Sequence, residues 1–340
     1  MAGPDAFKQR YFTEIGPKYA HLTGNTTRDL LKKLLNIRQD LSGSITSNSV
    51  IHDNACGPGT ATEALISWCY EKGGGGGGDG DGNGSDTTTD KNVTPVPKSI
   101  VATDYVPAMI EAGERIKTEH IDAAIDDDDV TAARLWQNVR FKVTDSSDLS
   151  EFPDGTFTHG FCNFSVFNLT HPERCLGEMY RTLRGGSGSE SGATAVVTCW
   201  KRFAASDLLS AAQRIVMGDE WERDHRLPVA GPEYLEDGYL ADLVRRSAGG
   251  SDAWETVETI ELKHLVKDEE DGEGRDWDGL YEFLTTTSLS GAATKGWTDD
   301  QVSQWPQAVK AAMKNEKERF GGLLFEAWAV VATKKTTKNK

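Results

Sequence analysis

Short apolar runs alternate with helix-length segments over residues 49–200. This alternation restricts the fold more than any other feature, because each strand–helix–strand unit keeps its two strands parallel and lays a helix over one face of the sheet. We expect strands at residues 49–55, 98–104, 138–145, 158–167 and 193–200, with helices at 59–72, 106–121 and 171–183. The pattern predicts an α/β fold with a doubly wound, mostly parallel sheet.

The remaining sequence adds to this sheet and covers it. Two further strands are expected at 254–266 and 323–333, which makes seven, and helices are expected near 205–217, 233–247, 276–287 and 298–318. Residues 5–37 are expected to be helical, with one apolar face formed by Leu30, Leu31, Leu34 and Leu35. We therefore predict a helical cover at 1–47, a domain at 48–333 with helical cap segments within 201–320, and a solvated tail at 334–340.

Three stretches contain too few apolar residues to form part of a core. Residues 73–92 are rich in glycine and polar side chains, residues 126–129 are all aspartate, and residues 185–192 are mainly glycine and serine. Such segments cannot bury enough apolar surface to offset the entropy lost on ordering. We expect surface loops at all three, and a flexible insert at 73–92.

Charge and composition exclude several classes of protein. Lys and Arg number 37 against 53 Asp and Glu, and a net charge of −16 would repel a nucleic-acid backbone. No apolar run reaches the roughly 20 residues that span a bilayer, and the N-terminus lacks the apolar segment of a signal peptide. Five cysteines without metal-ligand spacing are expected to be buried free thiols. We expect a cytoplasmic protein that binds neither nucleic acid, membrane nor metal.

The segment IHDNACGPGTATEAL at 51–65 joins the first strand to its helix through a glycine turn. In an open parallel sheet, ligands bind at the carboxyl ends of the strands, which is where this turn lies. A phosphate-binding P-loop needs a lysine after the glycines, and none follows Gly57 and Gly59. A dinucleotide motif needs a third glycine where Thr62 stands. The glycines alone do not identify the ligand.

Acidic residues after the strands narrow the choice. Asp104 ends the second strand, where a carboxylate can accept both hydroxyls of a ribose. Asp145 ends the third strand, where it could accept a bond from an adenine amino group, and the amide of Ser146 follows. An acid at Asp53 would repel a pyrophosphate but could hold the ammonium group of an amino acid, directly or through water. An adenosine joined to an amino acid without phosphate meets these conditions, which points to S-adenosylmethionine.

Several linked segments resemble the successive motifs of class I S-adenosylmethionine-dependent methyltransferases, whose fold is a Rossmann-like seven-stranded sheet. These segments are NACGPGT, ATDYVPAMI, VTDSSDLSEFPDGTFTHGF and LGEMYRTLRGG, within residues 48–200. DNACGPG, KYAHLTG and VVTCWKRF are also similar to fungal secondary-metabolism enzymes such as the gliotoxin bis-thiomethyltransferase. The sequence departs from the usual motif at Ala55, which replaces the first glycine and is tolerable if its backbone angles are ordinary.

The resemblance implies roles for individual residues. It implies cofactor contacts from the residues of the motifs and the N-terminal cover: Tyr19, Asp53, Ala55, Gly57, Gly59, Asp104, Tyr105, Met109, Asp145, Ser146, Asn163 and Phe164. Phe167, Trp200 and Phe203 are expected to form acceptor walls, and His171 is a weak candidate for a general base. Simpler interpretations remain open: core packing for Tyr19 and Trp200, helix capping for Asp104, an Asx-turn for Asp145, and an exposed helix start for His171.

Methyl transfer from a sulfonium needs positioning and desolvation rather than a metal. A thiolate acceptor is nucleophilic near neutral pH without a base, so the absence of a convincing base favours thiol S-methylation of a small metabolite, with an epidithiodioxopiperazine-like dithiol as one example. O- or N-methylation of a small metabolite remains an alternative. A second class is a cofactor-binding protein that transfers no methyl group and acts as a scaffold or a non-redox cyclase. The oligomeric state stays open.

Overall fold

The computed structural model describes residues 4–23, 25–73, 95–186, 192–227, 231–268 and 275–335. Nearly all of the insert expected at 73–92, most of the loop expected at 185–192 and most of the tail lie outside these residues.

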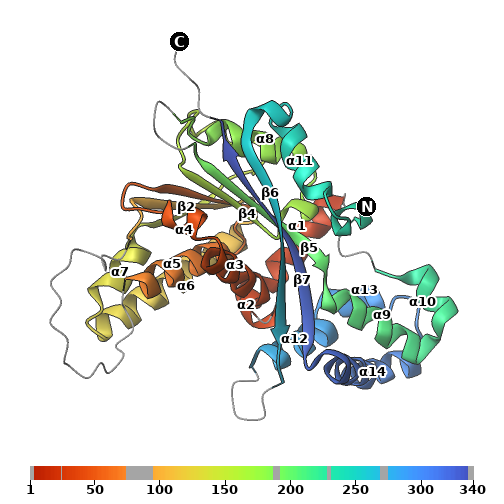
Figure 1. Cartoon of the computed structure of the whole chain (residues 1–340). Helices are drawn as coiled ribbons and strands as arrows, with labels where there is room; N and C mark the ends of the chain where they lie inside the picture. Colours follow the sequence, from red (N-terminus) through yellow and green to blue (C-terminus); the bar gives the residue numbers. More distant parts are fainter. Residues whose placement is uncertain are drawn as a thin grey trace.

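A seven-stranded sheet in the order β3-β2-β1-β4-β5-β7-β6 forms the centre of the described structure (Figure 1). The first five strands of this order pair in parallel, and β7 pairs antiparallel with both β5 and β6. The strands are β1 Val50–Asn54, β2 Ser99–Asp104, β3 Val139–Val143, β4 His159–Asn163, β5 Thr194–Arg202, β6 Trp254–Val266 and β7 Leu323–Lys334. The predicted doubly wound, mostly parallel sheet is confirmed.

Helices cover the sheet and extend beyond one of its ends. The N-terminal helices are α1 Pro4–Ile15, η1 Gly16–Lys18, α2 Tyr19–Leu22, α3 Thr26–Ile37 and α4 Gln39–Gly43. Those between the strands up to β5 are α5 Thr60–Lys72, α6 Pro107–Asp126, α7 Val130–Gln137, η2 Val166–Asn168 and α8 Pro172–Thr182. The later ones are α9 Ala204–Met217, α10 Asp219–His225, η3 Pro232–Leu235, α11 Tyr239–Ser247, η4 Ser251–Ala253, α12 Arg275–Thr286, α13 Ser288–Ala293 and α14 Asp299–Phe320.

Strand β5 is mostly apolar and is buried from Thr194 to Trp200. Successive side chains of a strand point to opposite faces, and both faces of this strand are covered. Val196 and Trp200 pack in the core that contains the leucines of α3, whereas Val197 and Cys199 pack in the core beneath α8 and α11. Figure 1 shows α8 and α11 together beside the sheet, while α9, α10 and α12–α14 gather as a cap at one end of β5 and β7.

The structure differs from the expectations at several element boundaries. Helices α7, α10 and α13 were not expected, and the helix expected at 233–247 is split into η3 and α11 by Gly238, whose φ is 85°. The acidic run at 126–129 forms the turn between α6 and α7, and Asp129 caps α7 by accepting a bond from the Ala132 amide at 2.9 Å. Strand β4 ends at Asn163, because Phe164 takes a φ of 53° and redirects the chain into η2.

All five cysteines are buried free thiols, as expected: Cys56, Cys69, Cys162, Cys175 and Cys199.

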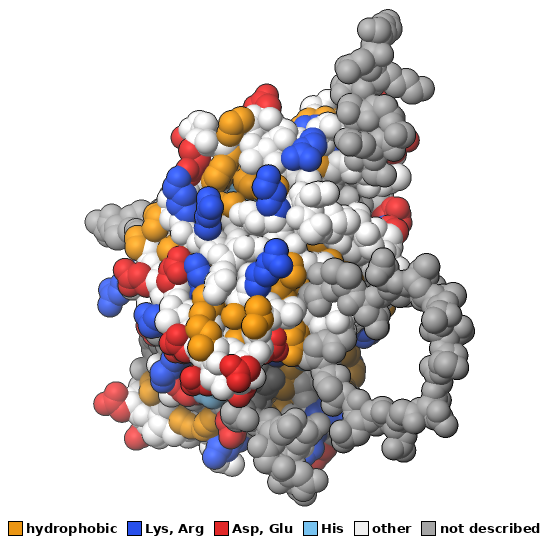
Figure 2. Space-filling view, turned by 90° about the vertical axis from the view of Figure 1, so that its left-hand side faces the viewer, with side chains coloured by type: hydrophobic (Ala, Val, Ile, Leu, Met, Phe, Trp, Pro, Cys, Tyr) orange, Lys and Arg blue, Asp and Glu red, His pale blue; other side chains and the backbone are white. Residues whose placement is uncertain are grey.

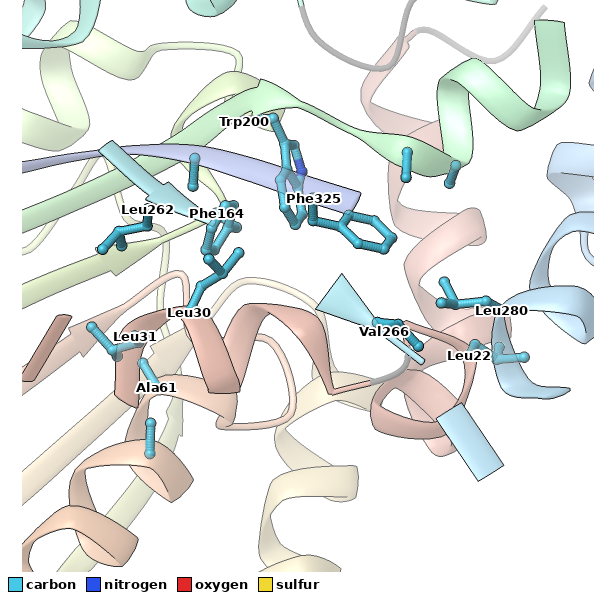
Figure 3. Close-up of a cluster of buried hydrophobic side chains, with 14 of the residues drawn as sticks. Leu22, Leu30, Leu31, Ala61, Phe164, Trp200, Leu262, Val266, Leu280 and Phe325 are labelled. Atoms are coloured by element: carbon cyan, nitrogen blue, oxygen red, sulfur yellow. The ribbon is translucent and has the colours of Figure 1, made fainter. Parts of the chain in front are cut away.

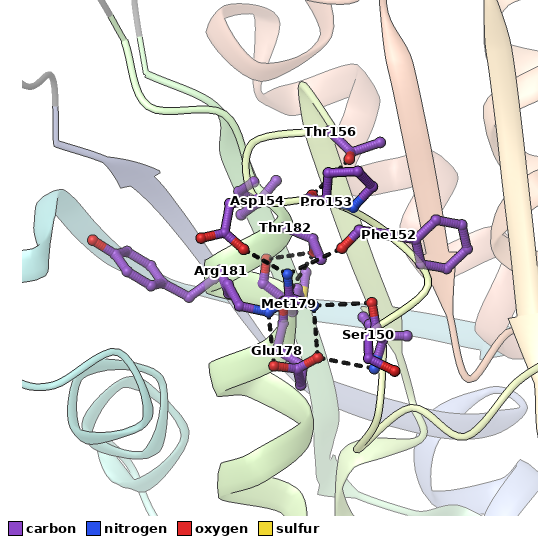
Figure 4. Close-up of polar contacts among 12 residues, drawn as sticks. Ser150, Phe152, Pro153, Asp154, Thr156, Glu178, Met179, Arg181 and Thr182 are labelled. Atoms are coloured by element: carbon purple, nitrogen blue, oxygen red, sulfur yellow. Dashed lines mark hydrogen bonds and ion pairs between the residues drawn. The ribbon is translucent and has the colours of Figure 1, made fainter.

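The Arg181 side chain on α8 holds the loop between β3 and β4 in place (Figure 4). Its Nη1 donates to the Phe152 carbonyl at 3.0 Å and to Asp154 Oδ1 at 2.6 Å. Its Nη2 donates to the Leu149 carbonyl at 2.9 Å, and Nε donates to Glu178 Oε1 at 2.9 Å. Glu178 also accepts a bond from the Leu149 amide at 2.9 Å. One guanidinium therefore satisfies loop carbonyls that have no partner in the sheet.

We predict that Arg181→Met lowers the free energy of unfolding by about 2 kcal/mol, because charge-assisted bonds to the loop carbonyls are lost. The measurement is urea unfolding followed by circular dichroism. Arg174→Met is the matched control, since Arg174 is an exposed arginine of the same helix. Equal effects of the two substitutions would show that the loop does not depend on Arg181.

Candidate functional site

A cavity lies where the chain leaves β1, β2 and β4 at their carboxyl ends. The strand order runs outward from β1 in one direction and from β4 in the other, so the chain reverses direction between these two strands. Crevices at such a reversal are where open α/β sheets bind ligands. Most of the residues expected to contact a cofactor line this first cavity: Tyr19, Ala55, Gly57, Asp104, Tyr105, Met109, Asn163 and Phe164.

The two glycines of the turn have different physical roles. Gly57 has a φ of 55°, and an added Cβ would meet no atom within 4 Å, so this position faces open space in the first cavity. Gly59 has a φ of 96°, and its Cβ would lie 2.8 Å from the Phe141 ring of β3. Gly57 therefore leaves room for a ligand, whereas Gly59 leaves room for an aromatic ring of the core.

Asp104 joins the glycine turn to the start of α6. Its Oδ2 accepts a bond from the Gly57 amide at 2.9 Å, and its Oδ1 accepts one from the Val106 amide at 2.9 Å. Burial raises the pKa of this carboxyl, although the bonds from the Val106 and Gly57 amides oppose that effect. Each oxygen keeps a further lone pair. The carboxylate thus binds the Val106 amide just ahead of α6 without capping the helix itself, and it still has acceptor capacity toward the cavity.

Two non-glycine residues that line the first cavity have left-handed backbone angles. Ala55 has a φ of 55° and Phe164 has a φ of 53°, and among the described residues the other non-glycine positions with positive φ are Asn25 and Asp128. Asparagine and aspartate tolerate this region, whereas alanine and phenylalanine adopt it at a cost of about 1 kcal/mol or more. The condition set for Ala55, ordinary backbone angles, is therefore not met. Such strain is characteristic of ligand sites.

Asp53 points into the protein rather than into the cavity. It is fully buried, and its Oδ2 accepts bonds from the Thr62 amide at 3.0 Å and the Thr62 hydroxyl at 2.8 Å. Thr62, at the place of the third motif glycine, is thus the anchor of this acid. Oδ1 of Asp53 is buried and has no hydrogen-bond partner in the protein. Burial raises the pKa of Asp53 to about 7, and the nearby Asp104 charge adds to this.

Three other predicted site residues do not line either of the cavities described in this section. Asp145 Oδ1 accepts bonds from the amide and hydroxyl of Ser147, both at 2.8 Å, which is the geometry of an Asx-turn. Ser146 is buried beside it. His171 is exposed at the start of α8, which matches the simpler interpretation of that residue.

Several residues of the first cavity were not anticipated: Phe12, Cys56, Pro58, Thr60, Ser165, Asn168 and Leu169. Asn168 and Leu169 could have been proposed, because they follow directly on the strand expected at 158–167, whereas Ser165 was expected inside that strand. Phe12 could not, since nothing local in the sequence indicates that α1 reaches this edge of the sheet.

A second, larger cavity of about 820 Å³ adjoins the first. All three expected acceptor residues line it: Phe167, Trp200 and Phe203. Figure 3 shows Trp200 hanging from β5 next to Phe164 and Phe325, and its ring centroid lies 4.2 Å from that of Phe164 and 4.8 Å from that of Phe203. The remaining wall comes from the N-terminal helices α1, α2 and α3, from Leu227, Gly231 and Pro232, from α12 and α13, and from Phe325 of β7. No Asp, Glu, Lys, Arg or His side chain of the described residues lines this cavity.

The two cavities share Phe12, Tyr19, Phe164 and Asn168. Burial raises the pKa of Tyr19 to about 12, and the Asp104 charge adds to the effect. Burial likewise raises the pKa of Tyr11 in the second cavity. Both phenols therefore stay protonated near neutral pH and cannot serve as general bases there.

We also searched the described residues for a metal site, a membrane-spanning helix and a basic surface stripe. It contains no group of three or more His, Cys, Asp or Glu side chains arranged to hold a metal ion. None of its helices is both long enough and apolar enough to cross a membrane. On the face shown in Figure 2, Lys and Arg side chains lie among acidic and hydrophobic ones instead of forming one continuous stripe.

The raised pKa of Asp53 gives a prediction for stability. An acid whose pKa is raised from 3.8 to about 7 on folding contributes nothing below pH 3.8 and destabilises the fold progressively between pH 4 and 7. Asp53→Asn should therefore raise the free energy of unfolding by at least about 2 kcal/mol at pH 8 and by less than about 1 kcal/mol at pH 4. Urea unfolding at both pH values is the measurement. Asp237→Asn is the control, because that aspartate is exposed, and an equal gain at both pH values would contradict the assignment.

Comparisons with known proteins agree with this geometry. Residues 78–188 match the family described as "Methyltransferase domain", and the matched range contains β2, β3, β4 and α8. The methyltransferase ucsB of Acremonium sp is 27% identical over 186 residues, which are 54% of this chain and 52% of that protein. The chain therefore spans about half the length of this curated relative.

Solved structures with a similar course of the chain share little sequence with it. A putative methyltransferase from Bacillus halodurans C-125 is 14% identical, with a TM-score of 0.43 over 90% of this chain and 99% of that one. The phosphoethanolamine N-methyltransferase 2 of Haemonchus contortus, solved with S-adenosylhomocysteine, is 12% identical, with a TM-score of 0.41 over 90% of this chain and 52% of that one. Likenesses of this size carry no weight for the choice of substrate.

Residues 78–188 thus match a methyltransferase domain, and the strand order and the cavity at the strand ends agree with that match.

Proposed function

We propose that this protein transfers a methyl group from S-adenosylmethionine to an uncharged small molecule. The observation that carries the proposal is the pair of adjoining cavities, which share Phe12, Tyr19, Phe164 and Asn168. One cavity lies at the strand ends and contains a carboxylate, and the other is large, apolar and free of charged walls. A donor and an acceptor bound in them would meet at the shared residues, which is the arrangement that direct transfer needs.

The residues of the first cavity fit the cofactor chemically. Asp104 retains a free lone pair on each oxygen, which suits the two hydroxyls of a ribose. Gly57 leaves open space where a side chain would otherwise stand. We likewise propose cofactor contacts from five further residues that line the first cavity: Tyr19, Tyr105, Met109, Asn163 and Phe164. Contacts from Asp53, Gly59, Asp145 and Ser146 would be indirect, since these residues support the cavity wall instead of forming it.

The first cavity encloses about 60 Å³, well below the roughly 300 Å³ of a small ligand pocket. Admitting the cofactor would therefore require the wall to open, and we propose that Phe12 and Tyr19 move outward with α1 and α2. Glu282 of α12 holds this segment through Lys18 Nζ at 2.9 Å and His21 Nε2 at 3.2 Å. Exposed ion pairs of this type contribute little to stability, so they would oppose such a movement only weakly.

When bound, the cofactor would supply an electrophilic methyl group on a positively charged sulfur. The aromatic rings of Phe164 and Trp200 at the junction would exclude water and attract this positive charge through their faces. The second cavity offers no base, because its titratable side chains among the described residues are Tyr11 and Tyr19, with raised pKa values. This supports an acceptor that ionises by itself, and a thiol meets that requirement better than an alcohol.

The finer assignments stay predictions. They are S-methylation of a secondary metabolite such as an epidithiodioxopiperazine-like dithiol, the resemblance to the gliotoxin enzyme, the cytoplasmic location, and the division into cover, domain, cap and tail. O- or N-methylation, or cofactor binding without methyl transfer, remain the alternatives.

For the cofactor, we predict that Asp104→Asn weakens S-adenosylhomocysteine binding at least tenfold, because charge-assisted bonds contribute about 1.5 to 3 kcal/mol. Isothermal titration calorimetry measures the affinity, with the melting temperature recorded alongside. Asp129→Asn is the control, since Asp129 also accepts a backbone amide at a helix start but lies outside both cavities. Unchanged affinity in the Asp104 variant would remove this residue from the site.

For the acceptor, we predict that labelled S-adenosylmethionine methylates a neutral aromatic thiol faster than the phenol or amine of the same skeleton. Phe203→Ala should raise the acceptor KM roughly tenfold and change S-adenosylhomocysteine affinity by less than about threefold, because Phe203 lines only the second cavity. Phe320→Ala, outside both cavities, is the control. Methyl transfer only to a protein or an RNA would contradict the acceptor class.

A further inference from the structure

Thr198 is a fully buried threonine of β5 that lines neither of the two cavities. Its hydroxyl donates to Asn163 Oδ1 at 2.8 Å and accepts a bond from the Phe164 amide at 2.9 Å. Asn163 lines the first cavity, and Phe164 lines both. One hydroxyl group outside the cavities therefore holds two successive residues at the end of β4, where the proposed donor and acceptor sites meet.

This hydroxyl uses both its hydrogen and its oxygen. The register of β4 and β5 places Thr198 opposite Asn163, so its side chain reaches the residue at the strand end and the amide of the next one. A threonine hydroxyl can donate one bond and accept others at the same time. Valine has nearly the same shape but can do neither, so it would leave the buried Phe164 amide without this acceptor.

Phe164 depends on this bond because its backbone is strained. Its φ is 53°, and it is the bulkiest of the described non-glycine residues with positive φ, the others being Asn25, Ala55 and Asp128. A bulky side chain keeps such an angle only where the surrounding contacts impose it. The ring then packs against Trp200 with 4.2 Å between the centroids (Figure 3). Without the Thr198 bond, the turn would relax and carry the ring away from the junction of the cavities.

The other partner of the hydroxyl extends the connection to the N-terminal helices. Asn163 Nδ2 donates to the Thr27 carbonyl of α3 at 3.2 Å, while its Oδ1 accepts the Thr198 bond. A continuous chain of hydrogen bonds thus runs from α3 through the end of β4 to β5. It fixes the Asn163 amide in the wall of the first cavity and the Phe164 ring in the wall of both.

We propose that Thr198 is a positioning residue for methyl transfer, which keeps the Phe164 ring at the meeting point of the two cavities. This rests on the proposed function, since it assumes that a donor and an acceptor occupy them. Misplacement by about 1 Å can lower the rate of a positioned reaction by roughly two orders of magnitude. Because Thr198 lines neither cavity, its loss should lower turnover more than it lowers ligand affinity.

The first test compares Thr198→Val with Thr198→Ser, which keeps the hydroxyl. With labelled S-adenosylmethionine and the neutral aromatic thiol, at a temperature where every variant is folded, Thr198→Val should lower kcat roughly tenfold or more. Its affinity for S-adenosylhomocysteine should stay within about threefold, and Thr198→Ser should regain kcat to within about threefold of the native value. Thr194→Val is the control, because Thr194 is a buried threonine of the same strand outside both cavities. A purely structural role would lower the melting temperature and leave kcat unchanged.

A second readout needs no ligand. In protein labelled with ¹⁵N-phenylalanine, the Phe164 amide is assigned by the signal that Phe164→Leu removes, and its exchange with D₂O is followed by NMR. Exchange should be roughly tenfold faster or more in Thr198→Val and close to native in Thr198→Ser, since only valine removes the acceptor. Native exchange or native kcat in Thr198→Val overturns the inference alone. A native protein that binds no S-adenosylhomocysteine contradicts the proposed function and the inference together.

Discussion

The carboxylate of Asp104 connects the parts on which the site depends. It accepts one bond from the Gly57 amide after β1 and another from the Val106 amide ahead of α6. These bonds hold two strand ends at a fixed separation and leave the glycine turn open toward the cavity. A carboxylate suits this position because it has enough lone pairs to bind two amides and still accept bonds from a ligand. A neutral side chain in the same place would stabilise one of the connections but not both.

Two strained residues lie next to this connection. Ala55 and Phe164 both have positive φ angles, and both line the first cavity. The strain at Phe164 is held by the Thr198 hydroxyl, which accepts a bond from its amide at 2.9 Å and donates to Asn163. This turn places the Phe164 ring against Trp200 (Figure 3) and brings it into both cavities. The left-handed backbone conformation at Phe164 thus positions the wall between the proposed donor and acceptor sites.

The second cavity differs from the first in its electrostatics. A buried carboxylate, that of Asp104, lines the first, whereas rings and aliphatic side chains from widely separated parts of the chain enclose the second. Such a low-dielectric space strengthens any polar interaction made inside it and penalises any left unmade. Its polar lining groups, such as the protonated tyrosines Tyr11 and Tyr19, are therefore the groups through which it can discriminate between ligands.

The sequence by itself determined the alternation of strands and helices, the seven-stranded sheet and the acids and glycines at the strand ends, because these follow from local periodicity and from residues adjacent to a strand. It also indicated Trp200 and Phe203 as neighbours of the site, since Trp200 was expected to end the fifth strand and Phe203 follows shortly after it. It did not reveal that Gly59 makes room for Phe141 while Gly57 faces open space, because that depends on which strand packs against the turn. Only the tertiary structure brought Phe12, Thr27, Leu280 and Ser288 into one cavity. Segments so far apart in the chain meet through packing of the N-terminal helices against the cap, and no local pattern in the sequence encodes that contact.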